Sequence, residues 1–179
     1  MSLGDDPVVA YYQDSLAAIQ ALGTGEPSLA SAIRTNLTKG LVLAAASSFE
    51  SALMGHLEAV YRRLLAAAPA LANFAVNTGM ERRYHAYFDW DRPNANKLFG
   101  HFGPEFAERL KSRIAGEPDL EQGMRDFMSL GRLRNELAHD DFAAYSLDLT
   151  LEEVFSRYQS ARRFLAELQM QTTWPKIEP

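Results

Sequence analysis

The sequence predicts an all-α fold. Its strong helix formers, Ala and Leu, total 49 of 179 residues, whereas the β-branched Val and Ile total 10. No segment shows four or more clean alternations of apolar and polar residues between turn residues, the pattern of a half-buried strand. Because 47% of the residues are hydrophobic, a chain of this length can bury a core without cross-links. We therefore expect an up-and-down bundle of about four main helices with short helices inserted.

The first expected element is a helix that begins at Asp5, Asp6 and Pro7 and runs to about Leu22. Acidic residues at the cap and proline in the first turn favour a helix start. The glycines and the proline of residues 23–27 break this helix. Residues 1–27 are interpreted as an N-terminal helix and turn, residues 28–171 as the helical bundle and residues 172–179 as a tail, in a single domain overall.

The second expected element is a long helix over residues 29–68. Ser28 can cap it, Gly40 can bend or split it, and Pro69 ends it. One apolar stripe repeats every three or four residues along it, the spacing of a helix face turned to a core. The stripe comprises Leu41, Ala45, Phe49, Leu53, Leu57, Val60 and Leu64.

Shorter elements follow. We expect a weaker helix over residues 70–84, an ordered aromatic loop over 87–94, and short helices from about 96 and over 104–114. A longer helix over 119–139 leads into a connector at 140–148. Thr150 and Glu153 form a capping box that opens a last helix to about Met170. Its apolar face comprises Leu151, Val154, Phe155, Tyr158, Ala161, Leu165 and Leu168.

Composition excludes several function classes. The absence of cysteine excludes a disulfide framework, a thiolate zinc site and a cysteine nucleophile, and it fits a cytoplasmic protein. No apolar run approaches the roughly 20 residues of a membrane span, and the first residues show no signal peptide, so no membrane partner is expected. A net charge of −5 disfavours non-specific DNA binding. The cations are 14 Arg against 4 Lys, and arginine suits two-point contacts to phosphate.

Common catalytic motifs are missing: the sequence has no glycine-rich phosphate loop, no GxSxG and no HExxH. His85 and His101 flank the aromatic loop near Asp89 and Asp91, but their spacing matches no known ligand pattern. No metal and no cofactor are therefore expected. His56 is most simply a partly buried residue of the bundle.

One segment at the end of the 119–139 helix can carry chemistry. Asn135 and His139 are four residues apart, about 40° around a helix, so they share a face, with Arg134 one residue back. Leu133 and Leu137 form the apolar edge that anchors them. A guanidinium beside a titratable imidazole suits a phosphate. From spacing alone, an exposed helix end with ordinary charges is the simpler interpretation.

The segment Arg134-Asn135-x-x-Ala138-His139 on the penultimate helix of a small helical bundle resembles the signature of the HEPN superfamily. The long helix with residues 47–53 and the insert at 88–100 are similar to the branch associated with RiboL-PSP ribonucleases. The resemblance covers roughly residues 30–170.

This resemblance implies a metal-independent endoribonuclease, a toxin or a defence or stress effector, whose substrate is RNA. It implies a homodimer in which two copies of the motif form one composite site, and an antitoxin protein as a further partner. His139 would transfer a proton, Arg134 would stabilise the charge growing on the phosphorane, Asn135 would hold the geometry, and Arg132 would contact a phosphate.

Two features leave an alternative open. Where many members have glycine after the histidine, this chain has Asp140 and Asp141, which favour the charged imidazole and suit a general acid. Glu50 on the long helix either pairs with Arg134 or belongs to the site. The alternative function is a non-catalytic module of the same fold that binds RNA, a nucleotide or a protein and serves in dimerisation.

Overall fold

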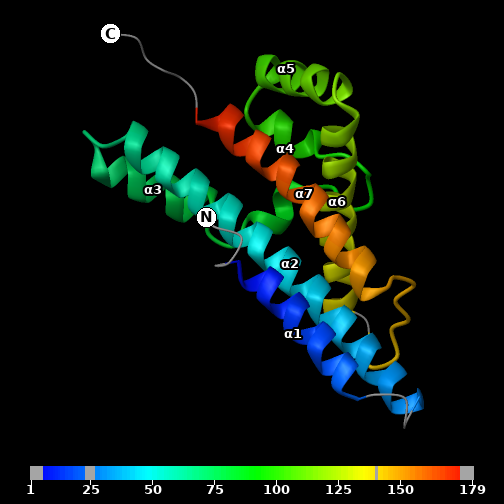
Figure 1. Ribbon diagram of the computed structural model, residues 1–179. Helices are drawn as coiled ribbons and strands as arrows, with labels where there is room; N and C mark the ends of the chain where they lie inside the picture. Colours follow the sequence, from blue (N-terminus) through cyan, green and yellow to red (C-terminus); the bar gives the residue numbers. More distant parts are fainter. Residues whose placement is uncertain (1–5, 23–26, 140, 174–179) are drawn as a thin grey trace.

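The computed structural model describes residues 6–22, 27–139 and 141–173, and all regular elements in these ranges are helical, which confirms the predicted all-α class. The chain folds in the order α1 (Pro7–Ala21), α2 (Pro27–Leu64), α3 (Pro69–Gly79), the 3-10 helix η2 (Tyr84–Tyr87), α4 (Asn96–His101), α5 (Pro104–Ala115), α6 (Pro118–His139) and α7 (Leu151–Thr172) (Figure 1).

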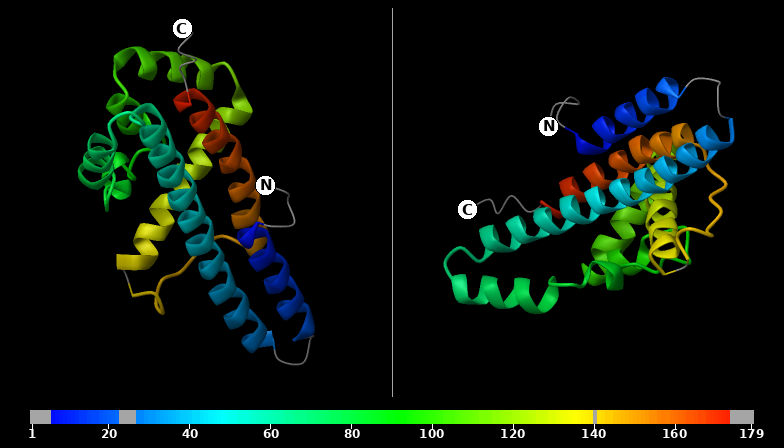
Figure 2. Two further views of the ribbon diagram at one scale, coloured as in Figure 1. Left: turned by 90° about the vertical axis from the view of Figure 1, so that its left-hand side faces the viewer. Right: turned by 90° about the horizontal axis from the view of Figure 1, so that it is seen from below.

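The long helices alternate in direction. In both views of Figure 2, α1 runs antiparallel to α2, and α7 runs alongside α2 in the same direction. An ion pair of 3.7 Å joins Arg34 to Glu152 at the start of α2 and α7, and Gln169 donates to the Ala52 carbonyl further along both helices. Helix α6 runs antiparallel to α7, with Arg157 donating to Ser129 at 2.7 Å. This arrangement leaves the C-terminal end of α6 beside the middle of α2.

The apolar stripe of α2 is confirmed as far as Leu57, which is 5% exposed, but Leu64 is 54% exposed. The stripe ends there because its partner α7 ends at Thr172, whose hydroxyl lies 2.8 Å from His56 Nε2. His56 is thus the partly buried bundle residue that was predicted.

Helix α1 packs on α2 and α7. Its cap, Asp6, accepts a hydrogen bond from the Val8 amide at 2.9 Å and another from the Tyr158 hydroxyl at 2.8 Å. Gly40 does not split α2, which runs unbroken through it. Its place is explained by packing, since a Cβ there would lie 2.0 Å from the Tyr11 hydroxyl.

Three predicted boundaries were wrong. Ser28 is not a cap but lies inside α2, which begins at Pro27. Helix α2 ends at Leu64 rather than residue 68, because the turn closed by the Ala68 amide on the Leu65 carbonyl reverses the chain before α3. Helix α3 ends at Gly79 rather than residue 84, and Arg82 takes a φ of 57°, which no helix can continue through.

The start of α7 and the aromatic loop agree with the sequence prediction. Thr150 and Glu153 form the predicted capping box, and the 87–94 segment is an ordered aromatic loop whose Phe88 is 2% exposed. Of the predicted tail, Thr172 ends α7, and residues 174–179 lie outside the described residues. In the described part of the chain, none of the helices has the length and apolar character needed to cross a membrane.

Candidate functional site at the end of helix α6

The motif lies on the last two turns of α6. Leu133 and Leu137 are 6% and 3% exposed and hold these turns against the bundle, as the spacing predicted. Arg134 and Asn135 are half-buried, and the Arg134 guanidinium donates from Nη1 to Asn135 Oδ1 at 3.3 Å. A cation and an amide are thereby fixed against each other on a rigid helix.

His139 is the last residue of α6 and is exposed. Of the two aspartates that follow, Asp140 lies outside the described residues, and Asp141 accepts a hydrogen bond from the Ala143 amide at 3.0 Å. The carboxylate of Asp141 is therefore engaged in the turn that starts the connector.

Two residues from other elements meet the motif. Glu50 on α2 and His85 on η2 approach each other, with His85 Nε2 3.9 Å from Glu50 Oε2. Glu50 is thus paired with the His85 imidazole. The sequence had left open a pairing with Arg134 instead. Both side chains are about 40% exposed, at 39% for Glu50 and 40% for His85, so solvent and ligands can reach the pair.

Trp90 holds His85 next to α6. Its indole Nε1 donates to the His85 carbonyl at 3.2 Å, and its ring lies over Gly131 of α6. A Cβ at Gly131 would lie 1.9 Å from Trp90 Cζ3, so only glycine admits the indole at this position. Asn135 and His139 follow Gly131 at one and two turns along the helix.

The charges at this end act on one another. Burial lowers the pKa of His85, the Arg134 cation lowers it further, Glu50 opposes the change, and His139 adds to the lowering. Burial raises the pKa of the Tyr84 hydroxyl far above its ordinary value, with Glu50 adding to the shift and Arg134 opposing it. The imidazole of His85 is consequently biased to the neutral form. Its Nδ1 is buried with no hydrogen-bond partner among the described residues.

Arg132 points to a different neighbour. It donates to Glu136 at 2.6 Å, and Glu136 also accepts from the Tyr145 hydroxyl of the connector. Arg132 lines a groove of about 200 Å³ between α6 and the aromatic loop, next to Trp90. The structure therefore places this predicted phosphate contact beside the motif rather than within its Arg134–Asn135 pair.

His85 and His101 do not share a site. His101 ends α4 and packs its ring against Tyr87, with 5.7 Å between the ring centroids. Asp89 is paired with Arg92 at 3.7 Å. Among the residues that the structure describes, no three His, Asp or Glu side chains gather where they could hold a metal ion.

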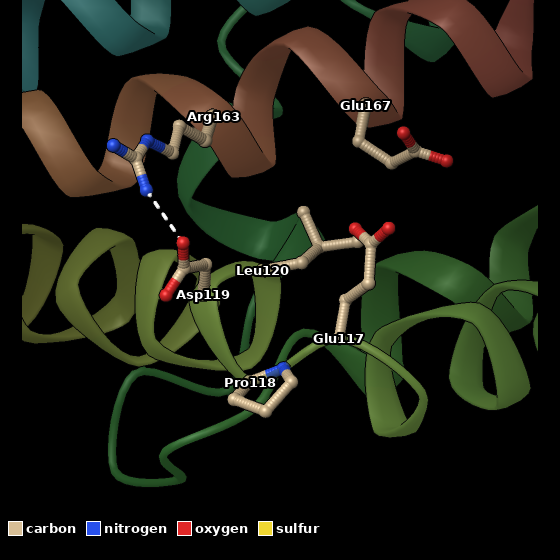
Figure 3. A pocket seen from close by; sticks show the side chains of 6 residues that line it. All are labelled: Glu117, Pro118, Asp119, Leu120, Arg163 and Glu167. Atoms are coloured by element: carbon tan, nitrogen blue, oxygen red, sulfur yellow. Dashed lines mark hydrogen bonds and ion pairs between the residues drawn. The ribbon is translucent and has the colours of Figure 1, made fainter.

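A larger hollow of about 570 Å³ lies at the other end of α6, where α5, α6 and α7 meet (Figure 3). Figure 3 shows Arg163 paired with Asp119 across it at 3.0 Å. Glu117 and Glu167 are held by Arg113, at 2.7 and 3.3 Å. Asp119 precedes Asn135 by about 24 Å along the helix. The charged side chains that line the hollow are thus already in ion pairs, far from the motif.

The sequence singled out Arg134, Asn135 and His139 as candidates through their spacing and the family resemblance, but it did not predict His85 as their neighbour. The sequence held one hint of this contact, because Trp90 follows His85 by five residues and Gly131 precedes Arg134 by three. The Trp90 ring needs that glycine in order to lie on α6. Neither separation in sequence reveals that the loop folds back on α6.

No protein-family model, curated protein or solved structure matches this chain significantly.

Proposed function

We propose that this protein is a metal-independent endoribonuclease of HEPN-like fold, with Arg134, Asn135 and His139 as its catalytic residues. The observation that supports this most is the Arg134–Asn135 hydrogen bond on a helix anchored by buried leucines, with an exposed imidazole at the helix end. A fixed guanidinium can hold two phosphate oxygens, and an imidazole can exchange a proton near neutral pH.

The reaction uses the RNA's own 2′-hydroxyl. One group takes the hydroxyl proton, and the 2′-oxygen bonds to phosphorus. The bond from phosphorus to the 5′-oxygen then breaks, and a second group gives that oxygen a proton. The products are a 2′,3′-cyclic phosphate and a 5′-hydroxyl. Arg134 stabilises the charge that grows on the phosphorane, and Asn135 holds Arg134 in place.

His139 is assigned the proton for the leaving oxygen. The other proton transfer, from the 2′-hydroxyl, is assigned to Glu50. Its carboxylate contacts His85 beside the motif, and its side chain is 39% exposed. His85 next to it is biased to the neutral form and so orients the carboxylate without neutralising it.

Cleavage of single-stranded RNA in EDTA tests this function. The expected result is cyclic phosphate ends with wild type, and loss of about 10²–10⁴-fold in rate with Arg134→Ala and with His139→Ala. Arg62→Ala and His101→Ala, an exposed cation and an exposed histidine elsewhere, serve as matched controls. Binding of many RNAs without cleavage would replace the proposal with the non-catalytic module.

A homodimer with a composite site is part of the proposal, and mixing two inactive variants tests it. If one cleft combines the motifs of two copies, Arg134→Ala and His139→Ala chains regain part of the activity when mixed, because half of the dimers then hold one intact Arg134 and one intact His139. If each copy contains a complete site, the mixture stays inactive. Sedimentation of the same samples reports whether the chains associate.

A further inference from the structure

The groove beside Arg132 is built from two elements, the aromatic loop and the exposed face of α6. It holds about 200 Å³ and lies one to two turns before the motif. Its lining includes Trp90, Arg92, Pro93, Arg125, Met128 and Arg132.

We propose that this groove binds one nucleotide of a single-stranded RNA, adjacent to the phosphate that is cleaved at the α6 motif. The inference rests on the proposed function, because it takes RNA as the molecule that lies along α6. It assigns Arg92 and Arg125, which have no role in the reaction, to substrate binding.

Arginine donors support an anionic ligand here. Three arginines line the groove with one carboxylate, Asp91. Each arginine also pairs with a carboxylate outside the lining: Asp89, Glu121 or Glu136. The groove therefore offers a phosphate several guanidinium donors rather than a net positive charge.

The carboxylates that already contact these arginines do not close the groove. Arg125 contacts Glu121 and Arg132 contacts Glu136, each at 2.6 Å and four residues apart, and Arg92 contacts Asp89 at 3.7 Å. Surface pairs of this kind are weak. Each guanidinium has five N–H donors, so a phosphate can bind beside the carboxylate or displace it.

The spacing of the arginines matches a strand that runs along the helix. Arg125 and Arg132 are seven residues apart on one face of α6, which separates them by about 10 Å. Asn135 follows Arg132 by about 4.5 Å along the helix, on the same side. A backbone held by the two arginines is thus directed to the motif.

The groove also has an apolar surface for a base. Half-buried Trp90 and exposed Pro93 provide this surface, whereas Met128 is 1% exposed and offers almost none. An apolar floor flanked by guanidinium groups fits a base that has left its stack, with its phosphates outside. Paired bases in a duplex cannot present this face, so the ligand is single-stranded.

Fluorescence of Trp90 tests the proposal directly. The chain has two tryptophans, so Trp174→Phe leaves Trp90 as the sole reporter. In that variant, with His139→Ala to prevent cleavage, a single-stranded RNA hexamer is expected to quench the emission. Arg92→Ala and Arg125→Ala should each weaken binding about 5- to 10-fold and reduce the slope of log affinity against log salt by about 0.7.

The matched control is Arg62→Ala, which removes an exposed pair of the same spacing, Arg62 with Glu58 at 2.7 Å. It should leave affinity and salt slope unchanged. Equal binding by wild type, Arg92→Ala and Arg125→Ala would overturn the proposal, as would equal quenching by duplex RNA.

The readouts separate this proposal from the proposed function. Groove-dependent binding without cleavage by the unmodified chain would refute the ribonuclease and leave the groove standing. Cleavage whose KM is unaffected by Arg92→Ala and Arg125→Ala would refute the groove and leave the ribonuclease standing.

Discussion

His85 Nε2 lies 3.9 Å from Glu50 Oε2, and this contact joins the 3-10 helix η2 to the middle of α2 beside the Arg134 motif. The pair gives the motif a carboxylate and a second imidazole from outside α6. Its consequences can be measured in both activity and stability.

Glu50→Gln should lower the rate of RNA cleavage by about 10²–10⁴-fold, because the amide cannot accept the 2′-hydroxyl proton. The variant keeps the side-chain shape, so the thermal midpoint should change little. Glu58→Gln, on the same helix and paired with Arg62, is the control and should cleave normally. A fully active Glu50→Gln would show that Glu50 transfers no proton.

The stability of the protein should fall as pH drops through about 6.5. Burial lowers the pKa of His85 and of His56, so the unfolded chain takes up protons that the folded chain resists. The free energy of unfolding therefore rises with pH in the window around and below the ordinary histidine pKa. Denaturant titrations from pH 5 to 8 should give this slope, and His85→Gln should flatten it. An unchanged slope would contradict the role given to His85.

Gly131→Ala should destabilise the protein by about 1–3 kcal/mol, because the new methyl group overlaps the Trp90 ring. Gly55→Ala, in the exposed middle of α2, meets no atom within 4 Å and should stabilise by about 0.5–1 kcal/mol. Denaturant unfolding of the two variants measures the contrast. Equal stability of the two variants would show that the Trp90 ring does not pack on Gly131.

Lys39→Ala should destabilise by about 2–4 kcal/mol. Lys39 is 2% exposed, and its ammonium donates to the Phe142 carbonyl at 2.7 Å, which fastens the connector after His139 to α2. Lys39→Met keeps the apolar stem and should lose less. Hydrogen exchange of the Tyr145 amide, which bonds to the Asp141 carbonyl, should accelerate in both variants. Unchanged exchange would mean that the connector is held elsewhere.

Asp6→Ala should cost about 2–4 kcal/mol, because Asp6 both caps α1 and accepts from Tyr158, while Arg162 lies 3.2 Å away. Asp14→Ala, on the exposed side of the same helix, is the control and should change stability by less than about 0.5 kcal/mol. Limited proteolysis should then release α1 from the Asp6 variant alone. Equal stability of the two variants would argue against this anchor.

Much of the fold was predictable because helix signals are local. The capping box at Thr150, the proline starts and the apolar stripe through Leu57 depend on residues a few positions apart. The predicted helix boundaries were wrong where contacts with residues distant in sequence determine the structure. Residue 40 is glycine because a side chain there would overlap Tyr11. Helix α3 ends early because the chain turns at Arg82 to start the aromatic loop.

The sequence alone determined the helical class and the shared face of Asn135 and His139, since both follow from periodicity and residue chemistry. Only the tertiary structure decided that Glu50 pairs with His85 and that Trp90 seats on Gly131. These contacts join residues from four separate segments, α2, η2, the aromatic loop and α6. Their meeting depends on how the elements pack, which no local pattern in the chain encodes.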